Sequence, residues 1–176
     1  TGERIAAVMP VHVFGHPADM ISIVELCKSF KIPVIADAAA ALGATYQNNK
    51  IGQTGADISV FSFNGNKSVT SGGGGGLVSD STELISHARH LATTGRTGST
   101  YDHDCIAFNY RMTNLQAAVG CAQMERINKI VLSKRNISRK YQEAFTSVEG
   151  VGLFPQADWA KSACWISGIF IKPASG

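Results

Sequence analysis

The stretch Asp57–Leu77 has the sequence DISVFSFNGNKSVTSGGGGGL, and the rest of the chain is interpreted around it. Its first part, Ile58–Phe63, has the apolar, β-branched and aromatic composition of a buried strand. Its last part is a run of five consecutive glycines, Gly72–Gly76. Glycine has no side chain to pack and loses the most conformational freedom on folding. The run therefore indicates backbone that comes close to another part of the molecule.

A single lysine, Lys67, stands between the strand and the glycines, with small polar residues on both sides. A lysine held where solvent is poor becomes a usable amine nucleophile, which is the basis of Schiff-base chemistry. The alternative is an ordinary loop lysine beside a flexible glycine linker. Spacing alone leaves both interpretations open.

Composition limits the class of protein. The chain has 176 residues, of which 44% are hydrophobic and 16% charged, so it can bury a core of one domain or slightly more. A net charge of +3 without a Lys/Arg run argues against a nucleic-acid partner. No stretch is long and apolar enough for a membrane span, and the first residues do not resemble a signal peptide.

The four cysteines are scattered, without a Cys-x-x-Cys pair or paired histidine spacing. This spacing predicts no metal site and favours buried, reduced thiols in a cytoplasmic protein. Both ends of the chain interrupt a pattern, because Thr1 opens directly onto a strand-like segment and IFIKPASG follows another. We therefore expect a fragment from the middle of a larger enzyme.

The N-terminal part predicts a strand–helix–strand unit. Arg4–Val13 is mostly apolar and predicts a buried strand, and HPADM then supplies a helix start, with Pro17 in the first turn. The helix is expected to run through Lys31, and Ile32–Ala36 to form a strand that stops at Asp37. Such a unit is typical of an α/β fold with a parallel sheet.

Further elements are expected along the rest of the chain. Two more strands flank the lysine loop, a capped helix begins at Ser81 or Thr82, and a surface loop or lid follows it. One long helix follows, and the beginning of a smaller domain completes the pattern. The residue ranges are 57–63 and 76–79 for the strands, 83–94 for the helix, 95–108 for the loop, 113–145 for the long helix and 151–171 for the start of the smaller domain.

Three side chains are expected to meet at one edge of the sheet. Asp37 and Ser62 each end a predicted strand, and Lys67 follows in the next loop. A carboxylate, a hydroxyl and an amine together suit pyridoxal phosphate, whose ring nitrogen needs an acidic partner and whose aldehyde needs an amine. For Asp37 the alternative is a cap on the following turn, and for Ser62 it is a hydroxyl bonded to local backbone.

The segment from IPVIADAAAALG to SFNGNKSVTSGGGGGLV closely resembles the DegT/DnrJ/EryC1/StrS family of sugar aminotransferases. PVHVFGHPADM upstream and FNYRMTNLQAAVGCAQME downstream match the same family in the same order. The resemblance covers about residues 8–141, and the SFNGNK segment is most similar to the branch that makes perosamine and the bacillosamine and legionaminic acid precursors. It implies a three-layer, fold-type I transferase with a mixed, mostly parallel sheet. Residues 1–148 would be the central part of its cofactor-binding large domain, and 149–176 would begin a truncated small domain.

The resemblance also assigns roles to single residues. It implies that Lys67 is the Schiff-base lysine, that Asp37 is the partner of the pyridine nitrogen and that Ser62 touches the cofactor phosphate. Arg111, in NYRMTN, matches the position that reaches into the neighbouring subunit's active site. Its alternative is an ordinary arginine before a helix. Where the family carries Gln or an acidic residue three positions after the aspartate, this chain has Ala40, so one polar contact near the cofactor is missing.

The implied activity is transfer of an amino group, with glutamate as donor, to a nucleotide-linked 4-keto-sugar in lipopolysaccharide or other surface-polysaccharide biosynthesis. The resemblance further implies a cytoplasmic homodimer with active sites at the subunit interface. A related family dehydratase would carry histidine in place of Lys67. A different alternative is a catalytically silent regulatory or assembly module that keeps the fold, with Ala40 as the indication.

Overall fold

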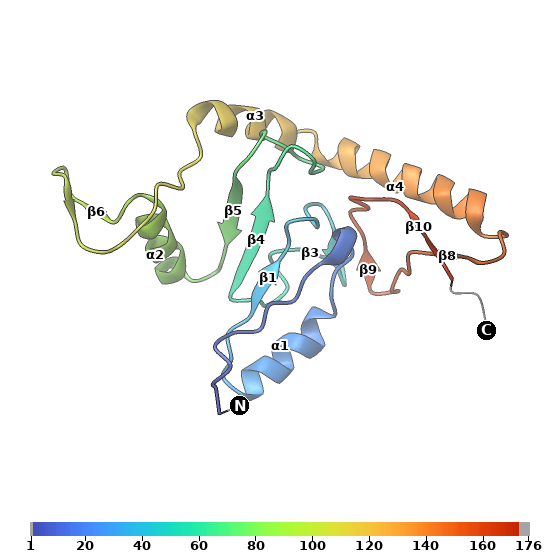
Figure 1. Ribbon diagram of the computed structural model, residues 1–176, viewed down its shortest axis with the longest axis horizontal. Coiled ribbons are helices and arrows are strands. Elements are labelled where there is room, and N and C mark those ends of the chain that lie inside the picture. The colour runs from blue at the N-terminus through green and yellow to red at the C-terminus, as the bar shows by residue number, and fades with distance from the viewer. Residues whose placement is uncertain (1, 173–176) are drawn as a thin grey trace.

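The computed structural model describes residues 2–172, and its main sheet has three strands in the order β1, β4, β5 (Figure 1). β1 (Ile35–Asp37) runs parallel to β4 (Ile58–Ser62), and β4 runs antiparallel to β5 (Gly75–Val78). The parallel pairing of β1 with β4 agrees with the mostly parallel sheet expected from the sequence, whereas the pair expected from the strand–helix–strand pattern, residues 4–13 with 32–36, is present only as isolated parallel bridges. The sheet itself is small and mixed.

The expectation of a buried strand over Arg4–Val13 is wrong. The segment makes only two isolated parallel bridges, Val8 to Val34 and Val11 to Asp37, and most of its side chains are exposed. It lies at the edge of the sheet with a neighbour on one side, and Pro10 has no N–H to donate to a ladder. The segment ends in a short 3-10 turn, η1 (Val13–Gly15).

Helix α1 (Met20–Ser29) covers the sheet and supplies one side of the core. The sequence predicted Pro17 in the first turn of this helix. In the structure Asp19 is the residue that precedes the helix, so Pro17 lies before the first turn. Asp19 accepts hydrogen bonds from the hydroxyls of Tyr46 (2.6 Å) and Ser22 (2.7 Å). The core formed under α1 comprises Met20, Val24, Cys27, Val34, Ala36, Ala38, Ala41, Ala44, Tyr46, Ile51, Phe61 and Ala163.

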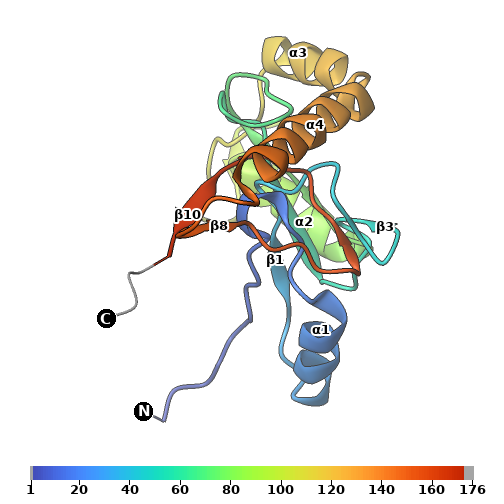
Figure 2. The same cartoon turned by 90° about the vertical axis from the view of Figure 1, so that its right-hand side faces the viewer.

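Three helices follow the sheet. α2 (Thr82–Ala92) is capped by Ser81, whose hydroxyl accepts from the Leu84 amide, so the cap is one of the two positions that the sequence predicted. The expected loop after it contains a short hairpin of β6 (Arg96–Thr97) and β7 (Asp102–His103). The expected long helix is two helices, α3 (Asn114–Met124) and α4 (Ile127–Phe145), divided at residues 125–126. Figure 2 shows α3 and α4 at the end of the molecule opposite α1.

The last part of the chain packs back onto earlier elements. β8 (Val151–Leu153) pairs with β10 (Ile169–Ile171), whereas β9 (Ala160–Lys161) joins β2 (Thr45–Tyr46), which also pairs with β3 (Asn49–Lys50). The domain division between residues 148 and 149 stays a prediction. Within residues 2–172, no helix has the length and apolar character needed to cross a membrane.

Arg135 of α4 fixes this return of the chain. Its guanidinium donates to the carbonyl oxygens of Ser162 (2.8 Å) and Gly43 (3.3 Å). Each of these carbonyls belongs to a loop with no regular partner at that point. One side chain therefore satisfies backbone groups from two distant segments.

The glycine run is in close contact at two of its positions. A Cβ at Gly75 would lie 2.5 Å from the Phe61 carbonyl oxygen, and a Cβ at Gly74 would lie 2.8 Å from Cε of Met112. The expected close backbone approach is confirmed there. At Gly72 nothing lies within 4 Å, so that glycine instead provides a positive φ of 80° for the turn.

Replacing Gly75 with Ala is expected to destabilise the fold by about 1–3 kcal/mol, because the new methyl group meets backbone that cannot move aside. Gly65→Ala is the matched control, since a Cβ there has nothing within 4 Å and neither glycine has positive φ. Urea unfolding of both variants measures the difference. Equal midpoints would contradict the steric interpretation of the Gly75 position.

Candidate active site

The carboxyl ends of β1 and β4 form one edge of the main sheet. Asp37 is the last residue of β1 and pairs with Val60, and Ser62 is the last residue of β4. Because the two strands are parallel neighbours, both side chains lie at the same edge, and the loop that carries Lys67 starts there. The sequence predicted this arrangement from strand ends alone.

Asp37 uses one of its carboxylate oxygens locally. Oδ1 accepts a hydrogen bond from the Ala39 amide at 3.0 Å, so the turn-capping alternative is realised for that oxygen. No residue in the described part of the chain donates to Oδ2. Asp37 can therefore hold the turn and still offer a charged acceptor to another group.

Ser62 also makes a local bond. Its Oγ accepts from the Asn64 amide at 3.3 Å, as expected for a hydroxyl at the end of a strand. The hydroxyl hydrogen is not used in that bond, because the amide is the donor. Ser62 thus keeps one donor for an anion bound at the start of the loop.

Lys67 lies over the face of Trp165. Its Nζ is 3.8 Å from the centre of the indole ring, and the indole Nε1 donates to the Asn66 carbonyl at 2.8 Å. The structure places Trp165 against the lysine loop. Nothing in the local pattern could show this, because the residues are 98 positions apart (165 − 67 = 98).

Gly15 links the Asp37 turn to Trp165. With φ at 89°, it comes so close to its neighbours that a Cβ would lie 2.8 Å from the Ala40 carbonyl oxygen and 3.2 Å from the Trp165 amide nitrogen. The turn after Asp37 and the tryptophan under Lys67 are therefore in contact through one residue. Asp37 and Lys67 thus belong to one continuous region of the molecule.

His12 adds a buried polar atom to the same region. Its ring is fully buried, and Nδ1 accepts from the Ala18 amide at 3.0 Å, so the neutral ring carries its hydrogen on Nε2. Nε2 has no partner among residues 2–172. Burial lowers the pKa of His12, the charge of Asp37 partly opposes this, and His16 lowers the pKa further.

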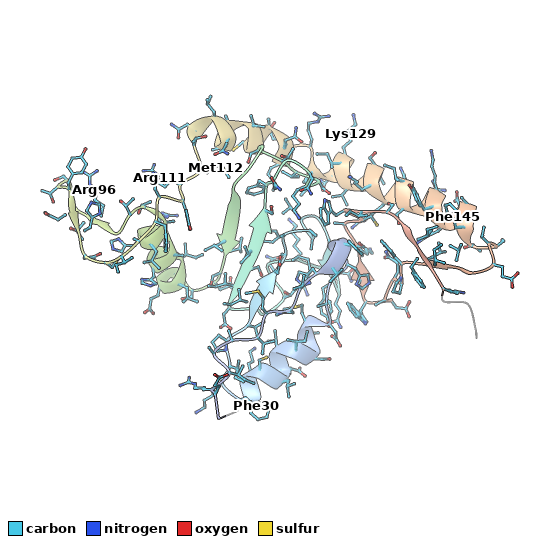
Figure 3. The ribbon with its side chains drawn as sticks, in the orientation of Figure 1. Phe30, Arg96, Arg111, Met112, Lys129 and Phe145 are labelled. Carbon is cyan, nitrogen blue, oxygen red and sulfur yellow. The ribbon has the colours of Figure 1, made fainter. Side chains whose placement is uncertain are left out.

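Arg111 lies apart from these residues. Figure 3 shows Arg111 and Met112 next to each other on the segment that leads into α3. The Arg111 side chain is exposed, whereas Met112 contacts the glycine run at Gly74. The structure therefore does not bring Arg111 to Asp37 and Lys67 within this chain, and its expected role toward a neighbouring subunit stays a prediction.

A cavity of about 550 Å³ lies between η1, α4 and residues 154–166. Its lining is largely apolar and includes Val13, Phe14, Phe154 and Ile166. Asp37, Ser62 and Lys67 do not line it. The residues that the sequence singled out therefore lie at the sheet edge and not along this cavity.

Comparison with known proteins now identifies the family. The model of the DegT/DnrJ/EryC1/StrS aminotransferase family matches residues 1–175. The chain belongs to this family. Its members are dependent on pyridoxal phosphate.

Individual members of the family show which enzymes the chain resembles in sequence. It is 38% identical to the GDP-perosamine synthase of Vibrio cholerae over 170 residues, which are 96% of the chain and 46% of that protein. It is 43% identical to the GDP-perosamine synthase of Escherichia coli O157:H7 over 147 residues, covering 83% of the chain and 40% of that protein. Perosamine synthases, expected from the SFNGNK segment, are thus among its relatives.

The fold agrees with the family. The crystal structure of the aminotransferase TlmJ from Streptoalloteichus hindustanus matches with a TM-score of 0.90 and 26% identity, covering 98% of the chain and 47% of that structure. The chain therefore spans about half the length of the relatives it matches. Over that half, the backbone follows that of an aminotransferase.

The free energy of unfolding is expected to decrease as the pH decreases, because of His12. Because the pKa of the folded ring lies below the ordinary value of about 6.5, the unfolded ring takes up its proton first as the pH decreases, and stability present above that pH is lost. Between pH 7.5 and 5.5 the loss is at most about 1 kcal/mol. His12→Asn keeps an acceptor for the Ala18 amide and should abolish this part of the loss.

Urea unfolding at the two pH values, for the wild type and the variant, measures the effect. His87→Asn is the matched control, because His87 is exposed on α2. Carboxylates titrate in all three proteins, so the comparison isolates the histidine. An identical pH dependence in the wild type and His12→Asn would show that His12 takes up a proton as readily in the folded protein as in the unfolded protein.

Proposed function

We propose that the protein is a pyridoxal-phosphate-dependent aminotransferase that transfers an amino group from glutamate to a nucleotide-linked 4-keto-sugar. The observation that carries the proposal is the parallel pairing of β1 with β4, which brings Asp37 and the Lys67 loop to one sheet edge. The relatives named as GDP-perosamine synthases make a GDP-linked sugar the first candidate substrate.

The residues present fit the cofactor. A phosphorylated pyridine aldehyde needs an amine, a carboxylate for the ring nitrogen and donors for the phosphate. Lys67 supplies the amine, Asp37 has a free carboxylate oxygen, and Ser62 has a free hydroxyl hydrogen. The buried atoms Nε2 of His12 and Oγ of Ser68 have no partner within the described chain, which is common where a ligand completes the hydrogen bonding.

Each of these side chains would then have a defined role. When bound, pyridoxal phosphate supplies an aldehyde for amines and a ring that withdraws electrons from the adjacent carbon. Asp37 would keep the ring nitrogen protonated, and Ser62 would donate to the phosphate. Lys67 would hold the cofactor between turnovers, and once released its amine would move the proton between the substrate carbon and the cofactor.

Other parts of the proposal concern the whole enzyme. We place the reaction in the cytoplasm and expect a homodimer, in which Arg111 of one subunit reaches the other subunit's cofactor. The three-layer large domain would be completed by segments that the longer relatives possess. Ala40 offers no polar side chain where the family has one, which is the observation that favours a silent module as the second candidate.

The protein expressed from its natural reading frame should absorb visible light after addition of pyridoxal phosphate, and borohydride should fix the cofactor onto Lys67. With glutamate and a panel of GDP- and UDP-linked 4-keto-sugars it should form an amino sugar. Lys67→Ala should lose both the label and at least about 10³-fold of the turnover, since nucleophile and proton carrier are removed together. Peptide mapping and chromatography of the sugar products measure these results.

Lys50→Ala is the matched control, because Lys50 is an exposed lysine of β3. A label on a lysine outside residues 1–176 would contradict the role of Lys67 and leave the enzyme class intact. A colourless protein at saturating cofactor, without turnover on any sugar, would support the silent module instead.

Asp37→Asn should weaken cofactor binding roughly 10- to 100-fold, because it removes the charge from a charge-assisted hydrogen bond to the ring nitrogen. Asp57→Asn is the matched control. Asp57 likewise accepts from backbone, its Oδ2 from the Val34 amide at 2.7 Å, but it lies at the opposite end of the strands. Equal affinities for pyridoxal phosphate in the two variants, measured by absorbance titration, would exclude the assigned role of Asp37.

A further inference from the structure

Trp165 holds the Lys67 loop by two different contacts. The ring face lies 3.8 Å from the lysine Nζ, and the ring N–H donates to the carbonyl of Asn66, the residue just before the lysine, at 2.8 Å. One contact acts on the charged end of the side chain and the other on its backbone. A side chain that only filled space would make neither the contact with the lysine charge nor the hydrogen bond to the same loop.

The backbone around Trp165 fixes the ring in this position. Cys164 is buried and has φ at 51°, a conformation that costs a non-glycine residue free energy and persists only where its surroundings demand it. Ala163 donates to the Gly15 carbonyl at 2.9 Å, and the Trp165 amide nitrogen faces Gly15 at close range. The indole is therefore presented by a tightly constrained turn.

The ring is the partner of the lysine charge in this part of the molecule. Among residues 2–172, the ion pairs are His90 with Asp104 and Arg139 with Glu143, and Lys67 takes part in neither. An aromatic face attracts an ammonium group without accepting its protons and binds it more weakly than a buried carboxylate does. Such a partner can hold the amine and still release it.

We propose that Trp165 is a positioning residue for Lys67: its π face holds the lysine ammonium, and its N–H fixes the loop, whenever the amine is not bonded to the cofactor. The proposal rests on the proposed function, in which the same amine leaves and returns in every turnover. Without the indole, the free amine would sample the open space of the loop. Trp165 would then act on the reaction through Lys67 only.

The decisive experiment changes the π face and leaves the shape and the N–H of the ring. Fluorinated tryptophans, from one to four fluorine atoms, are introduced at position 165 of the protein expressed from its natural reading frame. Each fluorine weakens the attraction of the ring for a cation and so releases the lysine side chain from the ring face to the reagent. Trace acetylation of Lys67 at fixed pH, measured by mass spectrometry without cofactor, should accelerate stepwise. The full series should give roughly a 2- to 5-fold increase, the size expected for a partly exposed cation–π contact.

The same series at Trp159 is the control. That ring packs on Tyr46 (5.0 Å between ring centres) and His16 (5.7 Å), so its fluorination should leave Lys67 acetylation unchanged. Trp165→Leu provides a second readout and should lower kcat with little change in KM for glutamate.

An acetylation rate that is independent of fluorine number at position 165 would overturn the proposal. This outcome is separate from a failure of the proposed function. Cofactor fixed by borohydride onto Lys67 tests that function directly, and it can succeed while the fluorine series shows no trend.

Discussion

The parallel pairing of β1 with β4 is the constraint on which the rest of the structure depends. It places Asp37 beside Val60, so the two strands end at the same edge and the Lys67 loop begins there. An antiparallel pairing would send that loop to the other end of the sheet, away from the carboxylate. The packing of α1 on this pair, with Met20 and Val24 in the core, keeps the two strands in register.

The candidate site also depends on the last part of the chain, which packs back against it. β9 pairs with β2, Arg135 ties two loops together, and Trp165 lies under Lys67. The candidate site is thus built from three stretches that are far apart in the sequence. Although the chain spans about half the length of its relatives, these three stretches already lie within it.

The sequence predicted those features that depend on local pattern. The ends of β1 and β4, the cap at Ser81 and the close approach at Gly75 follow from apolar runs, a capping residue and glycine chemistry. Trp165 could not be assigned, because its contacts come from tertiary folding across most of the chain. The exposure of Arg4–Val13 depends on having a neighbour on one side only, which an apolar run does not reveal.

The break between α3 and α4 also escaped prediction, for a different reason. It falls at Glu125 and Arg126, two good helix formers with no glycine or proline beside them. Intrinsic preference therefore favours one continuous helix, and packing overrides it. Val131 of α4 rests on Gly43, so the second helix is placed by the turn after Asp37 rather than by α3.

Gly15 is a position at which a larger side chain cannot be accommodated without a shift of its neighbours. Its missing side chain is what allows the Asp37 turn and the Trp165 turn to touch, and its neighbours Phe14 and His16 line the apolar cavity. Any enlargement at this position would push on the turn after Asp37 and on the turn that carries Trp165 together. A single substitution here would therefore disturb two separate parts of the candidate site at once, although Gly15 itself carries no chemical group.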